Sequence, residues 1–251
     1  MKRAHLLLIV LFFTQPIFAL ETSSLNLRVP GGLDPEQLVF TIPHRFYGKI
    51  NDHPLDNLFG IDHGANAGLA MRYRVWSGFE IEGSYAHSEK EYGVNAGYSF
   101  SLPRIIRSGI AVQYFDFKRA NITERRRNFF YQALFQSEPF WNKIRINLEG
   151  GYDGYNQRFG VGFGLDAGFD VTFGPIEGMH LVAEYFPVIK PETGVTSARN
   201  SFAVGLKART YGHHFMFFVG NNTEIGARRL MLGAPGNDLY LAFNIQRFLK
   251  F

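Results

Sequence analysis

Cysteine is absent from the 251 residues of this chain. Its absence excludes disulfides, thiolate-bound zinc, covalently attached haem and a cysteine nucleophile. Beyond the N-terminal residues there is also no apolar run of the roughly 20 residues that a membrane-spanning helix needs. The formal net charge is only +4, and the one dense basic run, residues 125–127, is typical of a solvated loop. We therefore expect no nucleic acid partner.

Catalytic signatures are missing as well. No G-x-S-x-G or H-E-x-x-H motif occurs, and the glycines at 160, 162 and 164 have the wrong spacing for a dinucleotide site. His213 and His214 are neighbours, and neighbours on a strand point to opposite faces, so they cannot easily share one metal ion. We expect no cofactor, no metal and no enzymatic activity.

The N-terminus has the layout of a secretory signal peptide. Lys2 and Arg3 precede an apolar stretch over residues 6–13, and Ala19 offers a small residue at the expected cleavage site. We expect three regions: a signal peptide over 1–19, a periplasmic N-terminal segment over 20–36, and a β-barrel domain over 37–251.

Glycine and aromatic residues are abundant, with 27 Gly, 26 Phe and 12 Tyr. Aromatic residues favour strands, and glycine within strands suits curvature or close packing. Strict alternation recurs along the chain and is clearest over 158–173, where Phe, Val and Leu alternate with Gly, Asp and Thr. The mean hydropathy of −0.10 fits such a barrel, because polar lumen residues offset apolar lipid-facing ones.

The alternation predicts about twelve strands, with ten or fourteen as alternatives, in an antiparallel transmembrane barrel preceded by a signal peptide. The expected strands are 37–46, 64–76, 79–88, 91–102, 108–118, 128–137, 143–153, 158–173, 178–187, 199–210, 213–221 and 238–251. Every second connection is short, whereas the other set contains three long ones. Short turns on one rim and longer loops on the other are the outer-membrane arrangement, which places both termini in the periplasm.

One register can be predicted in detail. Residues 64–76 and 79–86 both direct odd-numbered apolar side chains outward, and paired residues must share a face. A three-residue turn over 77–79 satisfies this condition and would pair Arg74 with Glu82 in the lumen.

The face opposite the apolar one is charged along most strands. Eleven residues are candidates for a lumen or binding surface: Arg72, Arg74, Glu80, Glu82, Arg145, Glu149, Asp166, Asp170, Glu184, Lys207 and Arg209. They fit a polar conduit or binding cavity. They fit equally well a set of mutually satisfied ion pairs that fills a narrow barrel, since buried charges must be paired or hydrated in either case.

The last strand, residues 238–251, places Phe251 on the outward face at the periplasmic rim. A terminal aromatic residue on an alternating last strand resembles the signal by which the barrel-assembly machinery recognises its clients. Arg247 also falls on this apolar face, where its cost is small if the side chain snorkels to the rim. If Arg247 pointed inward instead, a bulge between Ile245 and Leu249 would have to switch the faces.

Several motifs resemble those of an uncharacterised family of outer-membrane β-barrels, found mostly in Bacteroidota and known as a domain of unknown function. They are "IPHRF" at 42–46, "LFGIDHGANAG" at 58–68, "RTYGHHFMFF" at 209–218 and "LYLAFNIQRF" at 239–248. Tyr211 departs from the usual glycine. The motif positions, to which the resemblance assigns no role, are Pro43, His44, Arg45, Phe46, Gly60, Asp62, Asn66, Gly212, His213, Phe215, Asn244 and Arg247.

Three functions remain open. The first is a narrow pore or small-solute transport barrel in the outer membrane. The second is a structural barrel with a closed lumen, which would dock an envelope protein through loops 47–63 and 222–237. The third is a lipid-modifying enzyme, which needs a Ser–His or acid–His pair at the lipid-facing rim. The expected partners otherwise are outer-membrane lipid and the barrel-assembly machinery.

Overall fold

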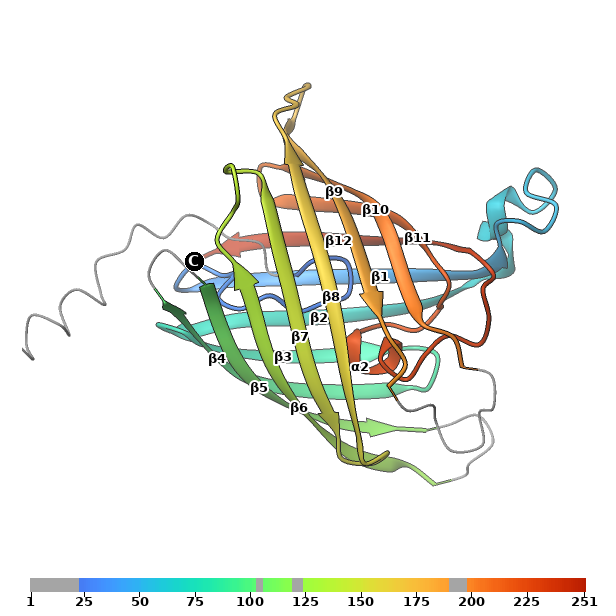
Figure 1. The fold of residues 1–251 in the computed structure, drawn as a ribbon, viewed down its shortest axis with the longest axis horizontal. Helices are drawn as coiled ribbons and strands as arrows, with labels where there is room; N and C mark the ends of the chain where they lie inside the picture. The colour runs from blue at the N-terminus through green and yellow to red at the C-terminus, as the bar shows by residue number, and fades with distance from the viewer. Residues whose placement is uncertain (1–22, 103–105, 119–123, 190–197) are drawn as a thin grey trace, which may run out of the picture.

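Twelve antiparallel strands close into a single barrel, because each strand pairs with its neighbours in the chain and β1 pairs with β12 (Figure 1). The computed structural model describes residues 23–102, 106–118, 124–189 and 198–251, so the expected signal peptide lies outside the described residues. The strands are β1 (Gln37–Lys49), β2 (Ala65–Trp76), β3 (Phe79–Ala86), β4 (Glu91–Leu102), β5 (Ile106–Phe117), β6 (Arg126–Ser137), β7 (Ile144–Asp153), β8 (Arg158–Phe169), β9 (Ile176–Phe186), β10 (Ser201–Thr210), β11 (His213–Gly220) and β12 (Tyr240–Lys250).

The two faces of the wall follow the alternation predicted from the sequence. In β8, for example, Phe159, Phe163 and Leu165 are exposed on the outside, whereas Asp166 is fully buried inside. An apolar exterior and a polar interior are what a transmembrane barrel requires, since closure pairs every strand edge. Within the described residues, neither η1 (Leu58–His63) nor α2 (Ala227–Leu230) is long or apolar enough to cross a membrane.

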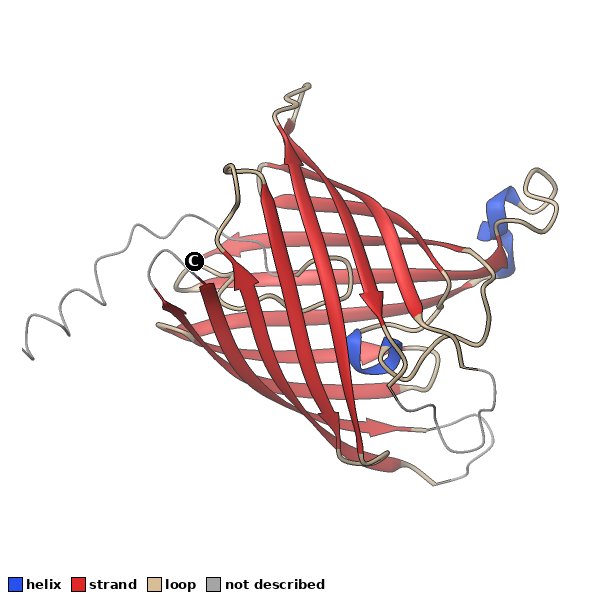
Figure 2. Cartoon of the chain, in the orientation of Figure 1, coloured by secondary structure: helices blue, strands red, loops and turns tan. Residues whose placement is uncertain are grey.

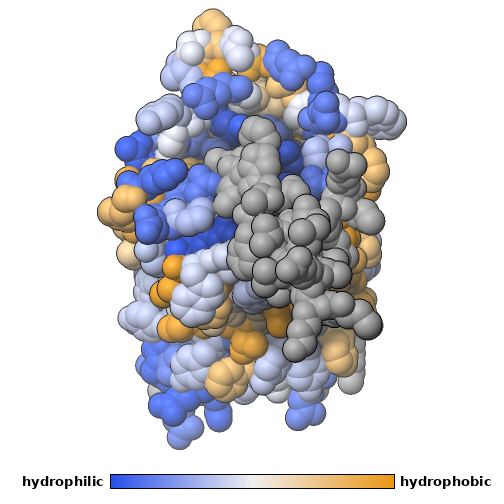
Figure 3. Space-filling model, turned by 90° about the vertical axis from the view of Figure 1, so that its left-hand side faces the viewer, coloured by the Kyte–Doolittle hydropathy of each residue, from blue (hydrophilic) through white to orange (hydrophobic). Residues whose placement is uncertain are grey.

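The two rims differ as predicted. One rim carries tight connections such as 77–78 and 211–212, and the C-terminus ends beside it at the left of Figure 1. The other rim carries the long connections 50–64, 187–200 and 221–239, of which 50–64 projects at the far right with η1 (Figure 2). Figure 3 views the short-turn end, where hydrophilic and apolar residues both reach the surface.

The turn between β2 and β3 differs from the prediction. Arg74 pairs with Glu80, not Glu82, and Trp76 pairs with Phe79 across a two-residue turn. The register shifts between Arg74 and Trp76, where β2 contains one extra residue. This extra residue lets a two-residue turn join the strands while even-numbered residues stay paired with even-numbered ones. Even-numbered residues of β2 and β3 therefore share a face, as predicted, but the predicted three-residue turn is wrong because a bulge achieves the same parity.

Strand β8 ends four residues earlier than expected, at Phe169. Phe173 and Ile176 form a local bridge, which turns the chain back before residues 170–173 can join the wall. Asp170 consequently lies outside the lumen on the short-turn rim, exposed, with its carboxylate 2.6 Å from the Lys143 ammonium.

The main difference from the sequence analysis concerns two segments that are not strands. Most of residues 23–36, expected in the periplasm, lie inside the barrel, where Leu25, Leu27 and Val29 are buried, whereas Pro35 and Glu36 are exposed just before β1. The loop 221–239, expected to face a partner, also folds into the lumen, and all four residues of α2 are buried. We refer to residues 23–36 as the N-terminal plug and to residues 221–239 as the loop plug.

Candidate functional site

The wall brings most of the predicted lumen residues together. Eight of them are inside the barrel and buried or nearly so: Arg72, Arg74, Glu80, Glu82, Glu149, Asp166, Glu184 and Lys207. Arg145 and Arg209 are half-buried near the short-turn rim, at strand pairs with Asp166 and His214 respectively. Asp170 is the candidate that falls outside. Charged side chains therefore line the lumen, and the chain segments inside the barrel determine how these charges are paired.

Glu184 anchors the apex of the N-terminal plug. Its carboxylate accepts hydrogen bonds from three consecutive backbone N–H groups, those of Leu25, Asn26 and Leu27, at 2.7–3.0 Å. The plug turns tightly here, with Ser24 N–H donating to the Leu27 carbonyl oxygen. Successive N–H groups that converge in this way form an anion-binding concavity, and Glu184 supplies the anion.

Two motif residues hold the other side of this apex. The Arg45 guanidinium donates to the Asn244 side-chain oxygen at 2.8 Å and to the Asn26 side-chain oxygen at 2.7 Å. Asn244 in turn donates to the Leu25 carbonyl oxygen at 2.6 Å. The "PHRF" motif on β1 and the "FNIQRF" motif on β12 therefore meet at the plug, because β1 and β12 are the pair that closes the barrel.

Arg28 connects the N-terminal plug to β3 and β7. Its guanidinium lies 3.4 Å from Glu80 and 3.3 Å from Glu82, and its backbone N–H donates to Glu149 at 3.0 Å. Arg72 of the wall also contacts Glu82, at 2.7 Å. Burial, together with the nearby Arg72, lowers the pKa of Arg28 despite the opposing effect of the neighbouring carboxylates.

The loop plug is also held by arginine–carboxylate ion pairs, at the long-loop end of the lumen. Arg228 pairs with Glu91 and, at 3.4 Å, with Asp153, while Arg229 pairs with Glu89 and, at 2.8 Å, with Glu91. The Arg228 guanidinium also lies over an aromatic ring of the wall, 4.2 Å from its centroid. Burial lowers the pKa of Arg229 to about 10, which leaves its guanidinium charged at neutral pH.

Residues of both plugs belong to one apolar cluster. Leu27 of the N-terminal plug and Leu230 and Met231 of the loop plug pack with four phenylalanines of the wall: Phe115, Phe117, Phe130 and Phe186. The glycines of β8 make this possible, since an added Cβ would lie 2.6 Å from Met231 at Gly160 and 2.6 Å from Leu27 at Gly162. These glycines are lumen-side spacers, as the sequence indicates.

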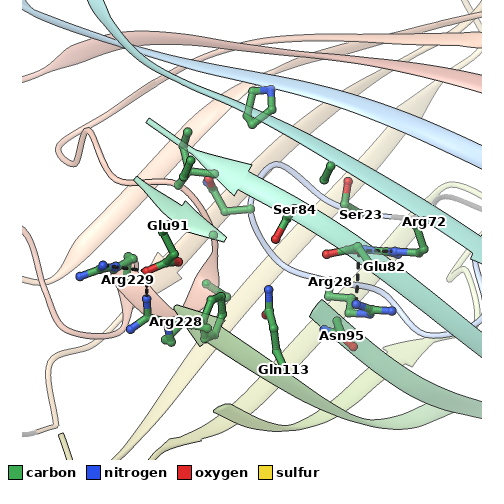
Figure 4. Close-up of a pocket in the computed structure, with 18 of the residues that line it drawn as sticks. Ser23, Arg28, Arg72, Glu82, Ser84, Glu91, Asn95, Gln113, Arg228 and Arg229 are labelled. Carbon is green, nitrogen blue, oxygen red and sulfur yellow. Dashed lines mark hydrogen bonds and ion pairs between the residues drawn. The ribbon is translucent and has the colours of Figure 1, made fainter. Parts of the chain in front are cut away.

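A cavity of about 150 Å³ remains between the plugs. Figure 4 shows it spanning from the Arg28–Arg72–Glu82 group to the Arg228–Arg229–Glu91 group, with Ser84 and Gln113 between them. Two buried atoms at its wall, the Asn95 side-chain oxygen and Arg228 Nε, have no hydrogen-bond partner among the residues that the structure describes. Such a polar space has room for several water molecules, so the closed lumen retains a hydrated core.

Asp166 forms a separate charged group on the inner face of β8. It pairs with Lys207 and with His180, and both Asp166 and Lys207 are fully buried. Two further acid–His contacts, Asp62–His63 and Asp52–His53, lie on the exposed loop 50–64. Among the described residues, none of these three contacts is on the lipid-facing wall. The described residues contain no cluster of three or more possible metal ligands.

Most of the remaining motif residues lie at the long-loop end of the lumen, on the outer wall or at the cavity. Asn66 is buried at the long-loop end, where it donates to the Thr223 carbonyl oxygen and accepts from Ser88 N–H. Outside the wall, His44 stacks on Phe243, and His213 contacts Arg247. Pro43 lines the cavity, Phe46 is half-buried, and Phe251 is exposed beyond the end of β12.

Sequence reasoning missed the three plug arginines and the carboxylates that pair with Arg228 and Arg229. Glu91 and Asp153 lie on the inward parity of β4 and β7 and could have been added to the lumen set. No pattern marked Arg28, Arg228 or Arg229 as interior residues, because they lie outside the alternating segments.

The fold and its lumen define a membrane β-barrel that is occupied by parts of its own chain. Residues 141–249, which include the strands from β7 onward, match the family described as "Membrane bound beta barrel domain (DUF5777)". No curated protein sequence matches the chain.

Solved barrels are similar in structure but distant in sequence. The KdgM porin has a TM-score of 0.53 at 12% identity, over 84% of this chain and 98% of that chain. LpxR from Salmonella typhimurium has a TM-score of 0.49 at 12% identity, over 86% of this chain and 100% of that chain. The likeness to the KdgM porin supports the barrel fold, and at this identity it carries over no function.

Proposed function

We propose that the protein is an outer-membrane barrel that works as a gated pore for small solutes, and that the N-terminal plug and the loop plug hold it closed. An alternating wall, short turns on one rim and long loops on the other support an outer-membrane location. The expected signal peptide over 1–19 and the terminal Phe251 fit export and recognition by the barrel-assembly machinery.

The observation that carries the proposal is that neither plug belongs to the wall. The pairing of β1 with β12 closes the barrel, and each wall strand already has a partner strand on both sides. The N-terminal plug is instead held by side chains, chiefly Glu184, Arg45 and Asn244. Its departure therefore breaks no strand pairing, whereas loss of a strand would open the barrel edge to lipid.

The open pore would prefer cations. Every buried charged side chain that the described plugs contribute is a guanidinium: Arg28, Arg228 and Arg229. These groups neutralise carboxylates of the barrel, including Glu80, Glu82 and Glu91 on the strands and Glu89 in the connection between β3 and β4. When the plugs leave, the carboxylates stay and attract counter-ions of positive charge.

Conductance in planar lipid bilayers tests the proposal. Three variants are compared with the full chain: a deletion of residues 23–33, the pair Arg228→Gln and Arg229→Gln, and both changes together. We expect the full chain to be silent and the combined variant to conduct steadily, with potassium preferred over chloride. The rim variant Lys143→Gln is the matched control, because its charge lies outside the lumen and its loss should open nothing.

A combined variant that is folded but does not conduct would overturn the proposal of a pore. Folding is checked by the shift in gel mobility on boiling, which reports an intact barrel. The second candidate, a closed structural barrel that docks an envelope protein, would then remain.

One feature favours that second candidate. The loop 50–64 presents Leu55 and Leu58 to solvent with exposed fractions of 80% and 61%, and Phe59 and Ile61 are exposed beside them. The loop is nevertheless well built, since the Asn57 side chain accepts from Gly60 N–H and donates to the Lys49 carbonyl oxygen. Ordered apolar groups at a rim suit a partner surface. Replacing Leu55, Leu58 and Phe59 by serine should abolish capture of such a partner and leave conductance unchanged.

A further inference from the structure

Arg247 is a cation on the outer wall that the pore does not use. Arg247 is exposed on the lipid-facing side of β12, between Ile245 and Leu249 on the same face. The register of β12 is continuous on both sides of this position, so no bulge turns the side chain inward. Its partner on β1 is the apolar Phe40, and its partner on β11 is His213.

Arg247 lies at the short-turn rim. His213 is the first residue of β11 after the turn 211–212, so the pair is one step from the end of the wall. The guanidinium leans over this turn, since a Cβ added at Gly212 would lie 3.5 Å from Arg247 Nη1. Tyr211 in the turn is 89% exposed, as expected of an aromatic residue at a membrane interface.

The guanidinium is held in position but is not neutralised. Arg247 Nη1 lies 3.0 Å from Nε2 and 3.1 Å from Nδ1 of the His213 ring, and that ring stacks on Phe215 with centroids 5.7 Å apart. Within the described parts of the chain, no carboxylate forms an ion pair with Arg247. A cation on an apolar surface at headgroup depth needs an anion, and the protein supplies none here.

We propose that Arg247 and His213 form a binding site for the phosphate of a glycerophospholipid at the short-turn rim. The planar guanidinium can donate two parallel N–H groups to phosphate oxygens, and the imidazole can donate a third. Phe40 and Phe215 border the pair on the outer wall and offer an apolar surface to the acyl chains. The choice of a glycerophospholipid over lipopolysaccharide rests on the proposed orientation, in which this rim faces the periplasm.

Native mass spectrometry of the detergent-solubilised full chain tests the site. The probes are phosphatidylglycerol, lipopolysaccharide and diacylglycerol, which has the acyl chains but no phosphate. We expect the wild type to retain phosphatidylglycerol and not diacylglycerol. Arg247→Gln should weaken retention about tenfold, because a charge-assisted contact is lost, and His213→Gln should have a smaller effect.

Lys250→Gln is the matched control, since it removes an exposed cation from the same strand three residues away. It should retain phosphatidylglycerol as the wild type does, and the gel-mobility shift should show that every variant is folded. Equal retention by Arg247→Gln and wild type would overturn the proposal, as would equal retention of diacylglycerol. Preferential retention of lipopolysaccharide would overturn the choice of lipid. These outcomes do not depend on conductance, so the pore can fail while the lipid site stands.

Discussion

Glu184→Gln is the sharpest test of how the N-terminal plug is held. The change keeps the shape of the side chain but removes its negative charge. In the wild type, the two carboxylate oxygens accept four backbone or side-chain N–H groups from residues 25–27, and the side chain is 3% exposed. Glutamine retains one acceptor oxygen and directs its own amide donor at the N–H groups of Asn26, with which it cannot bond.

The size of the effect follows from these contacts. Hydrogen bonds to a charged group contribute about 1.5–3 kcal/mol each, against about 1 kcal/mol for neutral ones. Losing the charge and one acceptor at a buried site should therefore weaken plug docking by about 3 kcal/mol. Since 1.4 kcal/mol is a factor of ten, the population of undocked plug should rise roughly 100-fold.

The natural absence of cysteine gives a clean assay for this population. Ser24→Cys places a single thiol on the plug, at a side chain that is 1% exposed and whose hydroxyl has no hydrogen-bond partner in the described part of the chain. The rate of labelling by a water-soluble maleimide then reports how often the plug leaves the lumen. We expect Glu184→Gln to raise that rate about 100-fold, and Glu177→Gln, an exposed carboxylate on the same strand, to leave it unchanged. Equal rates in the two variants would refute the anchoring role of Glu184.

Two further changes test other parts of the fold. Lys207→Met leaves the fully buried Asp166 carboxylate without its ammonium partner, which should cost about 3–5 kcal/mol and lower the temperature at which the barrel unfolds on a gel. Gly60→Ala would place a Cβ 2.1 Å from the Gly48 carbonyl oxygen at a φ of +89°, so limited proteolysis should cut within 50–64. Gly83→Ala, where an added Cβ meets nothing within 4 Å, should remain resistant.

The wall could be predicted from the sequence because its physical cause is local. A strand that separates lipid from lumen must alternate at every residue, and Asp166, Glu149 and Lys207 fall on the inward parity without any knowledge of the fold. Arg247 is placed on the outer face by the same rule. The turn after Trp76 could not be predicted, since a bulge and a longer turn satisfy the same parity.

The plugs could not be predicted because their cause is not local. Residues 23–36 carry no long alternating run, and loop 221–239 is polar and glycine-rich like any exposed loop. The partners that bury them are scattered over distant strands. The enzyme, metal and partner expectations have no test in the structure, so they stay predictions.

Once the strand order is known, the wall nevertheless indicates that a segment of chain occupies the lumen. Glu184 faces the lumen between Gly164 and Ala203, its cross-strand partners on β8 and β10, and neither can neutralise it. A buried carboxylate whose cross-strand partners carry no hydrogen-bond donor requires a donor from elsewhere. An added Cβ at Gly164 would lie 2.8 Å from Leu27, so the glycine beside Glu184 is also the space that the plug fills. An unmatched charge next to a glycine on the inner face of a barrel therefore predicts a segment in the lumen, and in this chain both features mark the residues that hold the N-terminal plug.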